Sequence, residues 1–233
     1  MAESSAKFSA WLPFVLQTSD PLFPTGAYAH SLGLEEMVRL GEVRDETTLG
    51  EFLKTQIVPA LAHHELPYLR FAREAAAREN VDELCSLDAE INAWKIGREL
   101  REASVQLGSR RLRMLAQIAP TPVLPHFERR ISRNEARGHH LVVCGLQFAP
   151  IPLDAALAAY FYQALAAQGS AALKLIRIGQ EGCQRVLREC LTECKSALVN
   201  SLAVEREDAG WFNPLLEIAA MRHERADERL FIS

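Results

Sequence analysis

The segment Cys183–Leu202 reads CQRVLRECLTECKSALVNSL, and the spacing of its apolar residues decides the fold class. Apolar side chains recur along it mostly at steps of three and four, at positions 183, 187, 190, 191, 194, 198 and 202. One face of an amphipathic α-helix has this spacing, because the helix completes a turn about every 3.6 residues. The segment therefore predicts a helix that buries one face.

Two further segments show a similar helical pattern. Residues Asp154–Gln168 begin with an acidic side chain, which favours a helix start, and Gly169 is expected to end this helix. The segment Trp211–Arg229 predicts a final helix, which the chain enters through Asn213 and the proline after it.

The stretch Leu84–Ile118 contains strong helix formers and no proline. It predicts one long helix or two, with Gly97 and Gly108 as weak points. Strand signals are scarce, since the nearest run of β-branched residues, Leu141–Cys144, is very short. The sequence therefore favours helices throughout.

The stretch Thr48–Ala77 also has a helical pattern, but Pro59 and Pro67 should kink or divide it, because each proline removes a backbone donor. No internal repeat or shift in composition separates two halves of the chain. The sequence therefore predicts an all-α fold, a single-domain helical bundle of roughly eight to ten helices over residues 1–233. We expect a flexible N-terminus (about 1–8) and a flexible C-terminal tail (about 226–233).

Composition narrows the class of protein. With 26 Lys and Arg against 30 Asp and Glu, the chain carries a net charge of −4 at pH 7, which argues against binding to nucleic acid. No stretch approaches the ~18 apolar residues that cross a bilayer, so no membrane segment is expected. The five cysteines show no disulfide spacing, and the first residues show no signal-peptide pattern. We therefore expect a cytoplasmic protein with free thiols.

The common catalytic motifs are absent from the sequence. It contains no Walker A phosphate loop, no Gly-x-Gly-x-x-Gly, no His-Glu-x-x-His helix and no Cys-x-x-Cys pair. It contains no Glu-x-x-His either, which argues against a di-iron helical bundle. We therefore predict that the chain is not an enzyme, has no catalytic residues and uses no cofactor.

Three groups of possible metal ligands remain, namely Cys183, Cys190 and Cys194; His139 and His140; and His63, His64 and Glu65. The cysteines lie on the apolar face described above, where packing as small hydrophobic side chains is the favoured interpretation. Adjacent residues of a helix point about 100° apart, so neighbouring histidines seldom bind one ion. A buried or helix-start role is favoured for His139 and His140, which stay weak metal candidates.

The most distinctive stretch is 19–35, which reads SDPLFPTGAYAHSLGLE. Pro21 and Pro24 move the residues before them away from helical geometry, and Gly26 can take a positive φ. Ser31 can act as the N-cap of a following helix. From these residues alone, an ordinary connector docked on its own core is favoured over a binding surface.

Together with three later stretches, this segment resembles the urease accessory protein F family (UreF). The family's early motif, Ser-Pro-x-Leu-Pro-x-Gly-Gly-Phe-Ser-x-Ser-x-Gly-x-Glu, aligns with Ser19, Pro21, Pro24, Gly26, Tyr28, Ser31, Gly33 and Glu35. An inserted Asp20, and Ala27 in place of the second glycine, depart from it. The later stretches are GHH at 138–140 followed by Gly145, LIRIGQ at 175–180, and MRHE at 221–224 followed by RLFIS at 229–233. Four motifs in the right order make the resemblance specific.

The resemblance implies an all-α homodimer that acts as a scaffold. Members of the family bind the accessory protein UreD (UreH in some species), recruit the nickel-carrying GTPase UreG, and help to pass nickel to apo-urease. GTP hydrolysis then belongs to the partner. The alternative is a metallochaperone that binds and carries nickel itself. The resemblance implies partner-binding roles for Pro24, Gly26, Tyr28, Ser31, Gly33, Glu35, Gly179, Gln180, His223, Glu224, Arg229, Leu230 and Phe231.

Overall fold

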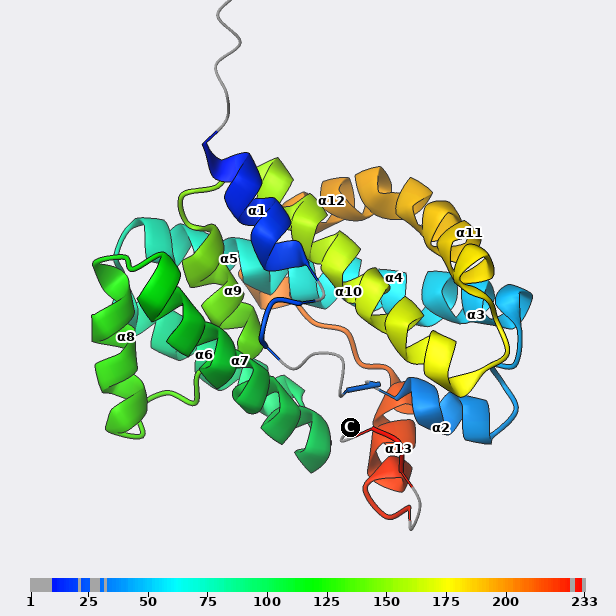
Figure 1. Ribbon diagram of the computed structural model, residues 1–233. Helices are drawn as coiled ribbons and strands as arrows, with labels where there is room; N and C mark the ends of the chain where they lie inside the picture. The colour runs from blue at the N-terminus through cyan, green and yellow to red at the C-terminus, as the bar shows by residue number, and fades with distance from the viewer. Residues whose placement is uncertain (1–9, 21, 26–29, 32, 227–228, 232–233) are drawn as a thin grey trace, which may run out of the picture.

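Helices make up 75% of the structure, and the residues that it describes contain no strand, which confirms the all-α prediction. The computed structural model describes residues 10–20, 22–25, 30–31, 33–226 and 229–231 (Figure 1). Within these ranges the chain forms 10 separate helical runs, in agreement with the predicted bundle. None of the helices in these ranges is long and apolar enough to cross a membrane.

The α-helices are α1 (Trp11–Ser19), α2 (Leu34–Arg39), α3 (Glu46–Phe52), α4 (Val58–Ala60), α5 (Leu66–Ala77), α6 (Val81–Trp94), α7 (Arg98–Ile118), α8 (Val123–Ser132), α9 (His140–Phe148), α10 (Leu153–Leu175), α11 (Gln180–Cys190), α12 (Cys194–Ala203) and α13 (Pro214–His223). Two π-helical segments are η2 (Leu53–Ile57) and η3 (Leu61–Glu65), and two 3₁₀ segments are η4 (Leu191–Glu193) and η5 (Arg206–Asp208). The segment 183–202, which decided the fold class, is helical as predicted, with η4 between α11 and α12.

Helix α9 forms the centre of the fold. Every residue from Leu141 to Phe148 is buried, as expected of a helix that is apolar on all sides. The neighbours α5 and α7 pack against α9, and α6 contacts it as well. Figure 1 shows α9 between α5 and α7. The core of the protein is therefore built around this short helix.

Glycines set the distance between α9 and its neighbours. A Cβ atom at Gly145 of α9 would lie 2.5 Å from the Cβ of Ala72 on α5, so a larger residue cannot occupy this position without moving the helices. On the other side, a Cβ atom at Gly108 of α7 would overlap the carbonyl oxygen of Gly138, just before α9. Gly108 lies inside an unbroken α7, so it is not the weak point that the sequence indicates.

The helical run expected over 48–77 is not divided at its prolines. Helical backbone continues from Glu46 to Ala77, with η2 just before Pro59 and η3 just before Pro67. A π-helical turn is wider than an α-helical turn, which relieves the clash between a proline ring and the preceding turn. The prolines are therefore accommodated by local widening of the helix.

Two other glycines have opposite effects on helix ends. The stretch 84–118 forms α6 and α7, and Gly97 marks the break between them, as predicted. Helix α10, in contrast, continues through Gly169 to Leu175, so the predicted stop is wrong. A Cβ atom at Gly169 would lie 2.9 Å from the sulfur of Cys183, so this glycine allows α10 and α11 to pack closely.

Replacing Gly108 with alanine is expected to lower the free energy of unfolding by about 1–3 kcal/mol, because the added methyl group meets backbone that cannot move freely. Replacing Gly50 of α3 with alanine should raise it by about 0.5–1 kcal/mol, because a Cβ atom there meets only Val186, at 3.9 Å. Urea denaturation measures both effects. Equal effects of the two substitutions would contradict the close approach of α7 to Gly138.

Candidate functional site

The C-terminal residues of the described chain meet the carboxylate of Glu35, in the first turn of α2. One oxygen, Oε1, accepts a hydrogen bond from the backbone N–H of Leu230 at 2.7 Å. The other, Oε2, accepts from the backbone N–H of Phe231 at 3.0 Å and lies 2.8 Å from Nε2 of His223. Glu35 therefore fixes α13 and the C-terminal tail to the N-terminal part of the protein.

The second ring nitrogen of His223 faces another carboxylate. Its Nδ1 lies 2.8 Å from Oε2 of Glu99 on α7, and Oε1 of Glu99 accepts from Nη1 of Arg229 at 2.9 Å. His223 is only 2% exposed. Each ring nitrogen of His223 therefore lies at hydrogen-bond distance from one carboxylate oxygen. We call Glu35, Glu99, His223 and Arg229 the terminal cluster.

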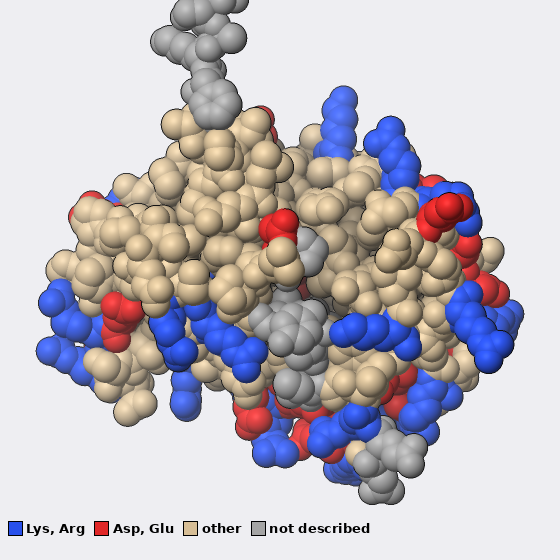
Figure 2. Space-filling view, viewed as in Figure 1, with Lys and Arg blue, Asp and Glu red and all other residues tan. Residues whose placement is uncertain are grey.

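Further contacts next to the terminal cluster tie the end of α13 to the start of α7, and the tail to α10. Nε of Arg98 donates to Glu224 at 2.9 Å, and the backbone N–H of Gly97 donates to Glu217 at 3.1 Å. Phe231 is buried, and the amine of Lys174 on α10 lies 5.2 Å from the centre of its ring. Figure 2 shows acidic and basic side chains interspersed over this end of the molecule, below α2. The tail thus docks through both charge and apolar contact.

The geometry around the start of α2 corrects the predicted helix cap. Ser31 was expected to cap the helix, but α2 begins at Leu34, and Gly33 occupies the cap position with a φ of 95°. This left-handed conformation strongly favours glycine. The Ser31 hydroxyl still contributes, because it accepts from the backbone N–H of Glu35 at 3.4 Å. Both residues therefore position Glu35.

The structure brings together most, but not all, of the residues that the family resemblance selected. Glu35, His223, Arg229, Leu230 and Phe231 form or contact the terminal cluster, with Ser31, Gly33 and Glu224 beside it. The remaining described candidates, Pro24, Gly179 and Gln180, are exposed and make none of these contacts, whereas Gly26 and Tyr28 lie outside the described residues. The sequence analysis missed Glu99, because it looks like any charged residue on a helix surface.

The flexible ends stay a prediction. Residues 1–9, which include the expected flexible N-terminus, lie outside the described part of the chain. Within the expected flexible tail, residues 229–231 contact Glu35 and Glu99 as given above.

A second buried carboxylate organises the loop before α9. The carboxylate of Asp88 on α6 accepts from the backbone N–H groups of Arg137, Gly138 and His139, at 2.5, 3.3 and 2.7 Å. Burial raises the pKa of Asp88, while these three hydrogen bonds oppose that rise. The loop that precedes the central helix is therefore held by one side chain.

The adjacent histidines at the start of α9 face different surroundings. The ring of His139 lies 3.1 Å from the Ser104 hydroxyl and 3.2 Å from the side-chain oxygen of Asn92. Burial, followed by the charges of nearby cationic side chains, lowers its pKa to about 4. His140 lines a cavity with Tyr160, and burial lowers its pKa well below 6.5. The two rings do not converge on one point, so their geometry offers no shared metal site.

The three cysteines of the deciding segment are packed as apolar side chains. Cys183 and Cys190 are buried, and Cys194 is half-buried. Burial raises the pKa of all three thiols, so they are protonated near neutral pH. This agrees with the interpretation as small hydrophobic residues.

Comparison with known proteins finds matches to the UreF family over most of the chain. A model of the UreF family matches residues 43–191. The chain is 32% identical to the urease accessory protein UreF of Arthrobacter sp. (strain FB24) over 219 residues, 93% of this chain and 95% of the relative. It is 33% identical to that of Paenarthrobacter aurescens (strain TC1), over 93% and 96% of the two chains.

The chain belongs to the UreF family of urease accessory proteins. Family membership supports a role in urease maturation. The family model covers neither Glu35 nor the C-terminal tail, but the match to the UreF of Haemophilus influenzae, at 30% identity, covers 100% of both chains. Both halves of the terminal cluster therefore lie within the matched length.

Replacing Glu35 with glutamine is expected to lower the free energy of unfolding by about 1–3 kcal/mol, because an amide NH₂ group takes the place of one of the two oxygens that face His223, Leu230 and Phe231. The backbone amides of Leu230 and Phe231 should exchange with solvent faster, because one of their acceptors is lost. Hydrogen exchange followed by NMR measures this directly. The control is Glu42→Gln, a change at an exposed carboxylate. Unchanged exchange in Glu35→Gln would show that the tail is held by other contacts.

Buried His139 predicts a loss of stability in acid. Its pKa of about 4 in the folded protein lies below the ordinary 6.5, so the unfolded chain binds more protons between these values. The free energy of unfolding should therefore fall as the pH drops from about 6.5 towards 4, by roughly 1.4 kcal/mol per pH unit for this group. Urea denaturation at a series of pH values measures this dependence. In His139→Gln the free energy of unfolding should change less with pH, by that amount per pH unit. The exposed His126→Gln is the control, and equal slopes for the two variants would refute the assignment.

Proposed function

We propose that the chain is a scaffold that holds UreD (or UreH) and the GTPase UreG together while nickel is inserted into apo-urease. Membership of the UreF family supports this role. The scaffold works in the cytoplasm, as a homodimer, and without catalytic chemistry of its own. The observation that carries the proposal is an apolar surface on α13, next to the terminal cluster.

Helix α13 packs on the protein with one side and presents apolar side chains on the other. Its residues Ala219, Ala220 and His223 are buried on the side that packs on the protein. Large apolar side chains on α13 and just before it are between 40% and 57% exposed, namely Trp211, Phe212, Leu215, Ile218 and Met221. We call these five residues the α13 face. Contiguous apolar surface that includes aromatic residues is typical of protein interfaces.

The terminal cluster explains why the α13 face has a defined shape. Salt bridges and hydrogen bonds from Glu35, Glu99 and Arg98 hold both the end of α13 and the tail that follows it. A surface that is ordered before binding loses less conformational entropy when a partner docks. The same contacts leave the side chain of Leu230 62% exposed beside the cluster. The proposed docking surface is therefore preorganised.

The metallochaperone alternative has less support. Across the part of the chain that the structure describes, no group of three His, Cys, Asp or Glu side chains is placed to hold a metal ion. The scaffold role rests on a contact surface that is present, whereas no observation favours direct carriage of nickel. We therefore keep the scaffold as the proposed function.

The test is co-expression of the chain with UreD and UreG, followed by pull-down and measurement of the mass of the complex. Ile218→Asp, on the α13 face, should reduce capture of the partners at least ~10-fold and lower nickel-dependent urease activity in cells, because burying a carboxylate in an interface is costly. The control is Val199→Asp, a change at an apolar residue of α12 that is 58% exposed. Full urease activation in cells that lack the chain would refute the proposal.

A further inference from the structure

Arg111 of α7 is a buried cation without a counter-ion. The residue as a whole is only 4% exposed to solvent. One terminal nitrogen donates to the side-chain oxygen of Gln147, the other donates to that of Gln163 at 3.4 Å, and Nε has no hydrogen-bond partner. No carboxylate of the described residues lies within 4.0 Å of it. The charge is therefore held by neutral groups only.

The other buried charges of the described chain are compensated. Of the buried Asp, Glu, Lys and Arg residues, Glu36 is paired with Arg39 at 2.6 Å, and Asp88 accepts three backbone hydrogen bonds. Burial of a charge is costly unless it is paired and hydrogen-bonded. Arg111 has no such counter-charge, so an anion bound beside it would reduce the cost of burying its charge.

The ring of Phe23 lies over the guanidinium, with its centre 5.3 Å from Cζ, and space for a charged partner exists in two cavities that Arg111 lines. A cavity of about 120 Å³ and another of about 90 Å³ share Arg111, Gln163 and Ala167 in their walls. A water molecule takes about 30 Å³ in the liquid, so either cavity has room for a molecule of a few heavy atoms. The ligand would therefore be small.

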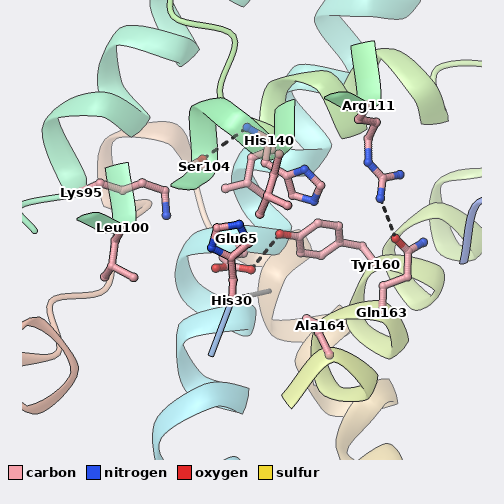
Figure 3. A pocket seen from close by; sticks show the side chains of 13 residues that line it. His30, Glu65, Lys95, Leu100, Ser104, Arg111, His140, Tyr160, Gln163 and Ala164 are labelled. Carbon is pink, nitrogen blue, oxygen red and sulfur yellow. Dashed lines mark hydrogen bonds between the residues drawn. The ribbon is translucent and has the colours of Figure 1, made fainter. Parts of the chain in front are cut away.

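Other charged groups also face the cavities, and the larger cavity has an excess of basic over acidic side chains, whereas the smaller one has one of each. In the larger cavity, Glu65 accepts from the Tyr160 hydroxyl at 2.9 Å, and Lys95 lines the same wall. Figure 3 shows Glu65 and Lys95 on the opposite side of Tyr160 from Arg111 and Gln163. In the smaller cavity, Asp20 is exposed and accepts from the backbone N–H of Leu22 at 2.7 Å.

The two histidines of the larger cavity add no positive charge near neutral pH. Burial lowers the pKa of both His30 and His140, in each case with a smaller contribution from a nearby arginine. Nδ1 of His140 is buried without a hydrogen-bond partner. His140 therefore offers the cavity a neutral ring that still has hydrogen-bonding capacity.

The glutamines hold the guanidinium in a fixed orientation. The amide nitrogen of Gln147 donates to the Thr18 hydroxyl at 2.8 Å, and that of Gln163 donates to the Ser19 hydroxyl at 3.0 Å. Both amide oxygens are thereby turned towards Arg111. A guanidinium that is oriented before binding loses less conformational entropy when an anion docks beside it.

We propose that the cavities beside Arg111 bind a small carboxylate anion, with Arg111 as its charge partner. The site lies away from the terminal cluster and the α13 face, and it does not depend on the proposed scaffold role. Because binding occurs only in the folded state, the anion stabilises the fold.

The test uses the purified chain with sodium formate or sodium acetate, titrated against sodium chloride at constant ionic strength. Isothermal titration calorimetry should show saturable binding of one anion per chain, and the melting temperature should rise with anion concentration. Arg111→Met should weaken binding at least ~10-fold, because the charge-assisted hydrogen bonds are lost. Without the anion this variant should be no less stable than the parent, since an uncompensated buried charge has been removed.

Two further variants keep the test decisive. Arg113→Met removes an exposed arginine from the same helix and should leave anion binding unchanged. Ala167→Leu keeps Arg111 but fills the wall that the two cavities share, and it should abolish binding even if Arg111→Met fails to fold. The proposal is overturned if the parent binds neither formate nor acetate, if Ala167→Leu binds as the parent does, or if phosphate binds more tightly than acetate.

Discussion

The position of α13 and of the C-terminal tail depends on the carboxylate of Glu35. Its two oxygens accept hydrogen bonds from the tail amides, and one of them lies 2.8 Å from Nε2 of His223, whose Nδ1 faces Glu99. Removal of a carboxylate from water is costly, and the cost is offset here because both of its oxygens have partners at hydrogen-bond distance. Residues separated by nearly the whole chain thus form one unit, on which the position of α13 depends.

Partly or fully buried carboxylates hold backbone that is not helical in two places of this fold. Glu35 binds the N–H groups of the tail, and Asp88 binds those of the loop before α9. Neither segment has helical or sheet partners for these donors, and an unpaired buried N–H is unfavourable. In each place one carboxylate accepts the backbone hydrogen bonds that a helix or sheet partner would otherwise accept. The central helix and the C-terminus are positioned in this way.

Helix content was predictable from the sequence because the 3.6-residue spacing is a local property, whereas the behaviour of individual glycines was not. Gly97 lies in the break between α6 and α7, whereas Gly108 and Gly169 lie inside helices, and the difference lies in the chain that packs against each one. The residues of the candidate site likewise fall into those that the sequence indicated and one that it did not. Glu35, His223 and Arg229 belong to motifs that resemble a family, but Glu99 has no distinguishing local pattern. Contacts between distant segments carry the missing information.

Stability of the fold alone does not explain a buried arginine at position 111. A protein that needed only a packed core at this position would be served by an apolar side chain of similar size, because a buried charge adds a cost that apolar packing does not. The structure instead holds the guanidinium with two oriented glutamines between two cavities. Glu99 supplies a counter-charge to Arg229 from within the chain. At Arg111 the proposed anion supplies it from outside.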